Sequence, residues 1–196
     1  HWTRFEGDHH SGALFDVGAE GEWDSLYNGW PQVVKADATD FRMYYHSYDR
    51  STKKFTVGVA LSTDGFEWVK KGPVLSGGTS KYDTYGVGCR SVLPDPSGKG
   101  YVMFGEGVGD DQKHTIGLYK SADGFEWTRA QEEPVLQQSE EGWDMRVVGC
   151  PRAVPMDDGS VRLYYCTPGD GMGMAVSDGT DWTKFTRVPT WHLNGP

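Results

Sequence analysis

The chain has 196 residues, a hydrophobic fraction of 37% and a formal net charge of −9. This length suits one ordinary domain, and the acidic charge argues against duplex nucleic acid and anionic membrane surfaces as general partners. No run of about 18 apolar residues occurs, so the sequence predicts no membrane span. The 27 Gly and 10 Pro favour an all-β chain with many tight turns.

The beginning of the sequence shows neither a start Met nor a signal-peptide pattern. We therefore expect a processed or truncated chain. The compartment stays open, with an extracytoplasmic or organellar location after processing among the alternatives. The three cysteines are too few for a disulfide scaffold.

The first full repeat, residues 31–75, reads as four short strands joined by turns. Apolar or alternating segments at 31–34, 41–45, 55–61 and 66–70 predict the strands. Asp64-Gly65 supplies the positive φ that a tight hairpin needs. Four strands joined by hairpins make one antiparallel meander.

Two further repeats, 89–136 and 150–188, follow the same plan. The turn phrase at 62–68 recurs at 121–127 and, shortened, at 177–182, and its Trp residues are Trp68, Trp127 and Trp182. A period of this size, made of short strands, is typical of a β-propeller whose repeats are four-stranded blades. Before each blade stands an aromatic-Asp pair, which we expect to wedge between blades and to cap a turn: Trp23-Asp24, Tyr82-Asp83 and Trp143-Asp144.

The ends of the sequence predict an incomplete ring. Residues 1–7 match the outer strands near Trp127 and Trp182, so we expect them to be the outer strand of a preceding blade. Residues 1–196 then form a single propeller domain, seen as a fragment with one orphan outer strand and three complete blades. Exposed blade edges favour pairing with another chain, so we expect a protein partner at the open edge.

The repeats resemble those of the five-bladed propeller glycoside hydrolases, the arabinanase, levansucrase and invertase group. The likeness rests on Trp23-Asp24, on Met43-Tyr44-Tyr45, and on the phrases at 58–68 and 72–75. It covers nearly the whole chain and implies a five-bladed ring. A weaker likeness is to the sialidase Asp-box, which carries one more residue between Asp and Gly.

The resemblance implies catalytic carboxylates at the beginnings of the inner strands, in an Asp-Pro-x-Val context. The matching positions here hold Trp30, Cys89 and Cys150, none of which is a carboxylate. The adjacent Pro is present in two of the three copies, which supports this alignment. Glycoside hydrolysis needs a carboxylic acid and a second carboxylate, so the sequence favours a propeller that does not cleave.

The ends of the second strands lie beside these positions, because the two strands are antiparallel. They hold His46, Glu106 and Cys166. Trp30 is a candidate platform for a sugar, and Glu106 is the best candidate for a catalytic acid. The predicted ligand-binding set, for a carbohydrate or another small polar ligand, is Trp30, His46, Arg90, Arg146 and Arg152. The alternative is that the arginines pair with Glu106 and bind no ligand.

The sequence predicts no metal site and no cofactor. Asp110, Asp111 and His114 match no standard metal spacing. His9 and His10 read as surface residues. The neighbouring positions of Cys150 and Cys166 leave a disulfide or thiol cluster open, with free buried thiols favoured.

Three functions follow from this sequence. The favoured one is a non-catalytic, glycosidase-like propeller that binds carbohydrate or serves as a protein scaffold. The second is an active glycoside hydrolase or phosphorylase whose acids lie in blades outside this chain. The third is a structural accessory subunit of a larger complex.

Overall fold

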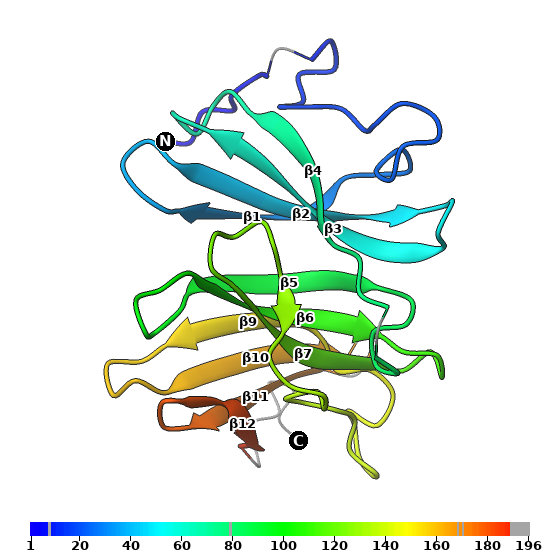
Figure 1. The fold of residues 1–196 in the computed structure, drawn as a ribbon, viewed down its shortest axis with the longest axis vertical. Helices are drawn as coiled ribbons and strands as arrows, with labels where there is room; N and C mark the ends of the chain where they lie inside the picture. Colours follow the sequence, from blue (N-terminus) through cyan, green and yellow to red (C-terminus); the bar gives the residue numbers. More distant parts are fainter. Residues whose placement is uncertain (8, 79, 168, 170, 189–196) are drawn as a thin grey trace. The chain divides into compact units, whose positions relative to one another are not determined.

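A computed structural model describes residues 1–7, 9–78, 80–167, 169 and 171–188. The chain divides into two compact units, residues 1–76 and 77–196, and each is considered by itself. All regular elements in the described ranges are strands (Figure 1). No helix of this part is long and apolar enough to cross a membrane.

The first unit contains one antiparallel four-stranded sheet in the order β1-β2-β3-β4. Its strands are β1 (Gly29–Lys35), β2 (Phe41–Asp49), β3 (Lys54–Ser62) and β4 (Val69–Leu75). The central strands β2 and β3 pair without interruption from Phe41↔Ser62 to Asp49↔Lys54. The apolar core gathers on this pair, because Tyr45 and Ala60 are buried there beside Trp68.

The second unit contains two such sheets, in the orders β5-β6-β7-β8 and β12-β11-β10-β9. The strands of the first are β5 (Val87–Pro94), β6 (Tyr101–Val108), β7 (His114–Ser121) and β8 (Thr128–Arg129). Those of the second are β9 (Gly149–Pro155), β10 (Val161–Thr167), β11 (Gly171–Asp178) and β12 (Asp181–Arg187). One apolar core joins the two sheets, since Phe104 of β6 packs with Leu163 of β10 and Trp182 of β12.

The prediction of three four-stranded antiparallel blades is confirmed. Residues 1–7 lie in no strand. The role of this segment as the outer strand of a preceding blade stays a prediction. The single domain and the partner at an open blade edge also stay predictions.

The Ser-x-Asp-Gly turn has the same hydrogen bonds in the first two blades. Ser62 Oγ accepts from Gly65 N at 2.8 Å, and Asp64 Oδ1 accepts from Phe66 N at 2.8 Å. The Trp68 indole then donates to the Gly65 carbonyl at 3.1 Å. In the second blade the corresponding distances are 2.7, 2.8 and 3.1 Å. Short-range side-chain acceptors therefore fix this turn locally.

The shortened third copy is held differently. The Trp182 indole donates to Gly159 O, in the hairpin between β9 and β10, at 3.0 Å. Ser177 Oγ accepts from Val161 N at 2.8 Å. Within the turn, Ser177 Oγ donates to the Gly179 carbonyl at 2.7 Å, so this turn is tied both to itself and to the neighbouring hairpin.

Each aromatic residue of the predicted wedges packs against the third strand of the blade that follows it. A Cβ on Gly58 would lie 2.3 Å from the Trp23 ring, and one on Gly117 would lie 2.7 Å from the Tyr82 ring. A Cβ on Gly173 would likewise lie 2.7 Å from the Trp143 ring. Glycine is required at these three positions because the ring occupies the space of a side chain.

The Asp that follows each aromatic is buried and accepts a hydrogen bond from a tyrosine hydroxyl. The pairs are Tyr45–Asp24 at 3.3 Å, Tyr119–Asp83 at 2.9 Å and Tyr165–Asp144 at 3.0 Å. Asp24 also binds Lys70, and Asp144 also binds Arg187, each at 2.8 Å. Asp24 and Asp144 therefore tie the outer strand to the second strand of their blades, beyond the turn-capping role expected from sequence.

Candidate functional site

The beginnings of the inner strands, where the resemblance places catalytic acids, are irregular in every blade. The register of β1 with β2 shifts between Gly29 and Gln32, and that of β5 with β6 shifts between Val87 and Arg90. The β9–β10 pair shifts opposite Tyr164 and Cys166. Trp30 and Cys150 occupy equivalent positions and have positive φ values of 52° and 47°. Such bulges re-aim side chains, and positive φ is uncommon outside glycine.

In the first unit, the strand start presents an aromatic face. The Trp30 ring stacks on the His46 ring with centroids 4.8 Å apart and planes 14° apart. Tyr27 meets His46 edge-on at 5.9 Å. His46 is 3% exposed, whereas Trp30 is 54% exposed. The structure thus brings together two predicted ligand-binding residues, with the larger ring open to solvent.

A hollow of about 220 Å³ lies in the same unit, and Gly29 and Pro31, the sequence neighbours of Trp30, help to line it. Phe15, Met43 and Tyr45 make its apolar wall. Its remaining lining residues are Leu14 and Asn28. An apolar hollow with few polar groups is suited to a small ligand with an apolar face.

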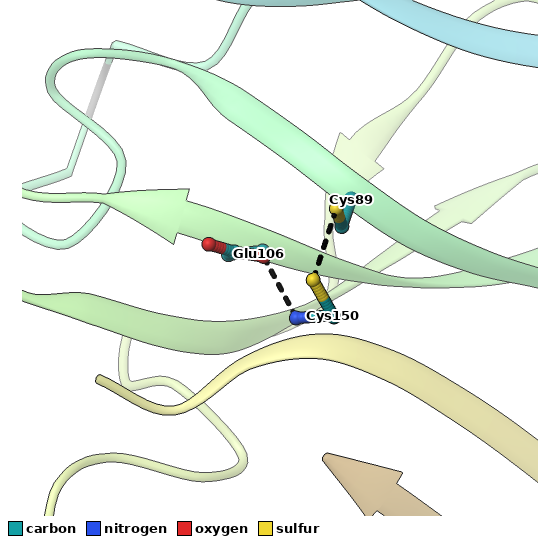
Figure 2. Close-up of side chains that lie close together, drawn as sticks. All are labelled: Cys89, Glu106 and Cys150. Carbon is teal, nitrogen blue, oxygen red and sulfur yellow. Dashed lines mark hydrogen bonds between the residues drawn. The ribbon is translucent and has the colours of Figure 1, made fainter. Parts of the chain in front are cut away.

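In the second unit, the two strand starts bring sulfur and carboxylate together (Figure 2). Cys89 Sγ and Cys150 Sγ lie 3.3 Å apart, and Cys150 N donates to Glu106 Oε2 at 2.7 Å. His114 Nδ1 lies 2.6 Å from Glu106 Oε1. Both carboxylate oxygens of the predicted catalytic acid are therefore engaged by the chain itself.

The thiols of Cys150 and Cys166 are held in the protonated form. The hydrogen bond with Cys89 raises the pKa of Cys150 far above its usual value, and burial and the charge of Glu106 act in the same direction. Burial, with the neighbouring Cys150, raises the pKa of Cys166 to about 12. A nucleophilic cysteine needs a lowered pKa, so neither thiol is set up as a nucleophile. All three cysteines are free.

The predicted arginines lie in different surroundings. Arg90 is 1% exposed, and burial lowers its pKa to about 9, which leaves it cationic at neutral pH. Arg152 is exposed and donates from Nη1 to the Arg90 carbonyl at 2.7 Å. Arg146 is exposed in the segment before β9. Glu106 pairs with His114, and its predicted pairing with an arginine stays a prediction.

His114 is the site residue that sequence reasoning missed. It was grouped with Asp110 and Asp111, but Asp111 instead pairs with Lys113 at 3.2 Å on the surface. The β6–β7 register sets Glu106 opposite Ile116, so His114 is its diagonal neighbour on the same face. Counting cross-strand pairs outward from the hairpin would have found this contact. His9 binds Asp16 at 2.7 Å, away from both strand starts along the chain.

A second hollow, of about 520 Å³, was also not anticipated. It lies in the second unit, between the segments 80–82, 110–115 and 132–138. Its lining is mostly charged or amide-bearing and includes Lys81, Asp110, Glu132 and Gln138. Asp110, Asp111 and Lys113, which lie between β6 and β7, line one side of this hollow.

The sequence of the chain matches no family model and no curated protein. Its fold does match solved structures. Fructan 1-exohydrolase IIa from Cichorium intybus superposes with a TM-score of 0.69 at 16% identity, over 89% of this chain and 33% of that protein. The chain has the fold of the β-propeller glycoside hydrolases.

Two further propeller structures agree. The structure of a BT0996 RGII complex gives a TM-score of 0.70 at 17% identity, over 90% of this chain and 60% of that protein. A GH130 structure gives a TM-score of 0.69 at 16% identity, over 94% of this chain and 58% of that protein. It is described with mannoside phosphorylases and with hydrolases that target β-1,2 mannosidic linkages in Candida mannan. The chain thus spans between 33% and 60% of the length of these three propellers.

Proposed function

We propose that this chain is a carbohydrate-binding propeller of the glycoside hydrolase fold that does not cleave its ligand. The observation that carries the proposal is the exposed indole of Trp30, fixed in parallel contact with the buried His46 ring. An aromatic ring held in one orientation offers a flat apolar face at low entropic cost. The C–H face of a pyranose or furanose ring complements such a surface.

The proposal that the chain does not cleave its ligand is supported by the surroundings of Glu106. Its two oxygens are engaged by His114 and by the Cys150 amide. Hydrolysis of a glycosidic bond requires a second carboxyl group about 5–10 Å from the first. The equivalent strand starts in the described blades carry Trp30, Cys89 and Cys150 in place of that second acid.

The test is calorimetric titration of the chain with oligosaccharides of the classes that its structural neighbours are described with. Suitable probes are 1-kestose, from the fructan exohydrolase complex, and a β-1,2-linked mannooligosaccharide. We expect Trp30→Ala to weaken binding at least about tenfold, which corresponds to about 1.4 kcal/mol. Its melting temperature should stay close to wild type, because the ring is largely outside the core.

Trp2→Ala is the matched control, because Trp2 is a fully exposed indole distant in sequence from the strand start. Binding that is equal in wild type, Trp30→Ala and Trp2→Ala would remove Trp30 as the platform. Release of monosaccharide from either probe, lost on Glu106→Gln, would replace the proposal with the hydrolase alternative. Failure of both probes, together with capture of a protein along a blade edge, would favour the scaffold role.

A further inference from the structure

All three cysteines of the chain gather around one carboxylate in the second unit. Cys89 is the third residue of the inner strand β5, Cys150 is the second residue of β9, and Cys166 lies near the end of β10. The Cys150 thiol contacts both other thiols, and the charge of Glu106 acts on Cys150 and Cys166. Residues 61 positions apart in sequence thus present two sulfur atoms to the same point.

The spacing of the potential ligand atoms suits a tetrahedral metal ion. The Sγ atoms of Cys89 and Cys150 and a carboxylate oxygen of Glu106 all lie within 4.8 Å of one another. Two sulfur atoms bound to one zinc ion at about 2.3 Å each are roughly 3.8 Å apart. The observed separation of 3.3 Å would therefore need to open by only about half an ångström.

The carboxylate is held in place by groups that do not compete for the ion. His114 contacts one oxygen at 2.6 Å, and the Cys150 amide donates to the other at 2.7 Å. A carboxylate offers about four lone-pair directions, so these two contacts leave it able to bind a metal. Gly149 is required here, because a Cβ at that position would lie 2.8 Å from the Glu106 carboxyl group.

Simple burial does not explain this arrangement. Thiols that pack as small hydrophobic groups have no need of a carboxylate beside them, and burying a carboxylate is costly without partners. Glu106 is 9% exposed and Cys89 is 8% exposed. Soft thiolates joined by a carboxylate are a ligand set for zinc. We propose that Cys89, Cys150 and Glu106 bind a zinc ion, with the Cys166 thiol as the fourth ligand.

Cys166 is assigned the fourth position because β10 pairs it with Gly149, the residue before Cys150, and because it is partly exposed. Its side chain would turn toward the other three ligands on binding. Binding converts the three thiols to thiolates and releases three protons to solvent. The buried guanidinium of Arg90, next to Cys89 in sequence, offsets part of the resulting negative charge.

The first experiment uses the wild-type chain, stripped of metal under reducing conditions and titrated with Zn²⁺ and with Co²⁺. We expect one metal ion per chain, a tetrahedral cobalt spectrum with thiolate charge-transfer bands, and protection of the cysteines from alkylation. Folded chain that binds neither ion would overturn the proposal. A Cys89–Cys150 disulfide in chain purified with reductant would overturn it as well.

Substitutions then assign the ligands. Cys89→Ser and Cys150→Ser should lose the bound metal, whereas Cys166→Ser should keep it and lower the charge-transfer intensity by about a third, one thiolate in three. His114→Gln should weaken binding about 10- to 100-fold through loss of the contact that orients Glu106.

The matched control is Asp111→Asn, which changes an exposed carboxylate of the same unit and should leave stoichiometry and affinity unchanged. Circular dichroism of each variant shows that it is folded. Unchanged metal binding in folded Cys89→Ser or Cys150→Ser would contradict the ligand assignment.

Discussion

The inner strands of the two units begin at the same place in the blade but carry different side chains there: aromatic rings in the first unit, and thiols beside a carboxylate in the second. In the first unit an exposed Trp30 stacks on a buried His46. In the second, Cys89 and Cys150 gather around a nearly buried Glu106. The turns of the first two blades, by contrast, share their hydrogen bonds, and the Asp of each aromatic-Asp pair accepts from a tyrosine hydroxyl in both units. The blade framework thus tolerates a change of chemistry at its strand starts, and this separation of fold from site can be tested.

The largest effect is expected from the turn tryptophans. Trp127 is 8% exposed and Trp68 is 9% exposed, and each indole also donates to a turn carbonyl. Trp127→Ala and Trp68→Ala should each lower the free energy of unfolding by about 3–5 kcal/mol. Denaturant unfolding measures this loss. An unchanged midpoint in either unit would break the claim that the framework is shared.

The second-largest loss of stability is expected when the glycine beneath each aromatic ring is replaced. Gly58→Ala places a Cβ 2.3 Å from Trp23, and Gly117→Ala places one 2.7 Å from Tyr82. Overpacking of this kind costs about 1–3 kcal/mol, and the closer contact should cost more. Trp23→Ala added to Gly58→Ala should cost less than the sum of the two changes. Simple additivity in thermal unfolding would show that the ring does not occupy this space.

The buried Asp144 should make stability depend on pH. Burial raises its pKa, but hydrogen bonds from Ser139, Arg187 and Tyr165 outweigh burial and hold the pKa below the usual value. A carboxyl group with a lowered folded pKa stabilises the fold above the unfolded pKa, near 3.9, and this contribution is lost as the pH falls further.

Asp144→Asn should therefore lower the melting temperature at pH 7 and differ less from wild type at pH 3. Melting curves at the two pH values measure the gap. A gap that is equal or wider at pH 3 would contradict the assigned role of the charge.

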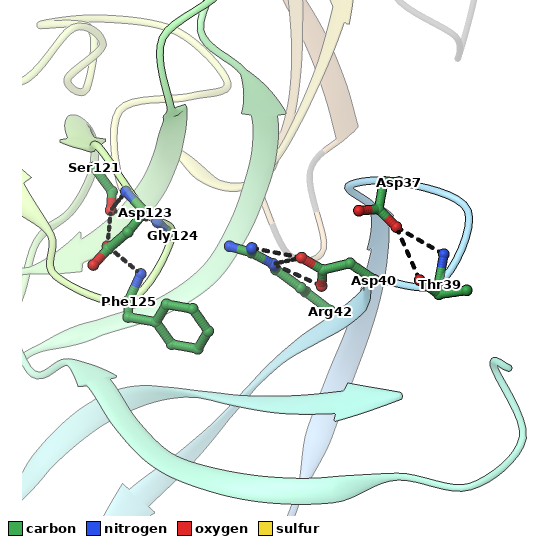
Figure 3. Close-up of polar contacts among 8 residues, drawn as sticks. All are labelled: Asp37, Thr39, Asp40, Arg42, Ser121, Asp123, Gly124 and Phe125. Atoms are coloured by element: carbon green, nitrogen blue, oxygen red, sulfur yellow. Dashed lines mark hydrogen bonds and ion pairs between the residues drawn. The ribbon is translucent and has the colours of Figure 1, made fainter. Parts of the chain in front are cut away.

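The smallest effect is expected in the exposed turn. Asp123 Oδ1 accepts from Phe125 N and Ser121 Oγ, as Figure 3 shows, and also from Glu126 N. Asp123→Ala should lower the melting temperature slightly, and Asp123→Asn should lower it less because an acceptor remains. Asp64→Ala should match Asp123→Ala, since the two turns share their geometry. A clear difference between them would show that the turns are not equivalent.

The parts of the fold that sequence predicted are those set by local rules. The Asp64-Gly65 and Asp123-Gly124 turns, the alternating strands and the repeat of Trp residues all act over a few residues, and the three four-stranded sheets follow. Asp24 and Asp144 were expected to cap turns, and the structure adds tyrosine and cation partners from later strands. Those partners lie about 20 to 46 residues away, beyond the reach of a local pattern.

The sequence predicted most residues of the candidate site but fewer of the contacts between them. Trp30 and His46 were placed on one face from strand pairing, and they stack. The approach of Cys89 to Cys150 depends on how β5 packs on β9, and His114 reaches Glu106 through a diagonal register position. Packing between sheets and side-chain rotamers are not encoded in the spacing of residues along one strand.

The most direct test of the account is proton NMR on 1-kestose and on a β-1,2-linked mannooligosaccharide mixed with the wild-type chain. Saturation transfer from the protein reports binding, and a time course of the same sample reports cleavage. The account predicts transfer to the ring protons of a bound sugar, loss of that transfer in Trp30→Ala, and no new monosaccharide signals. Monosaccharide signals that grow with time in the wild type would contradict it, because they would show that the propeller has kept the chemistry that its strand starts lack.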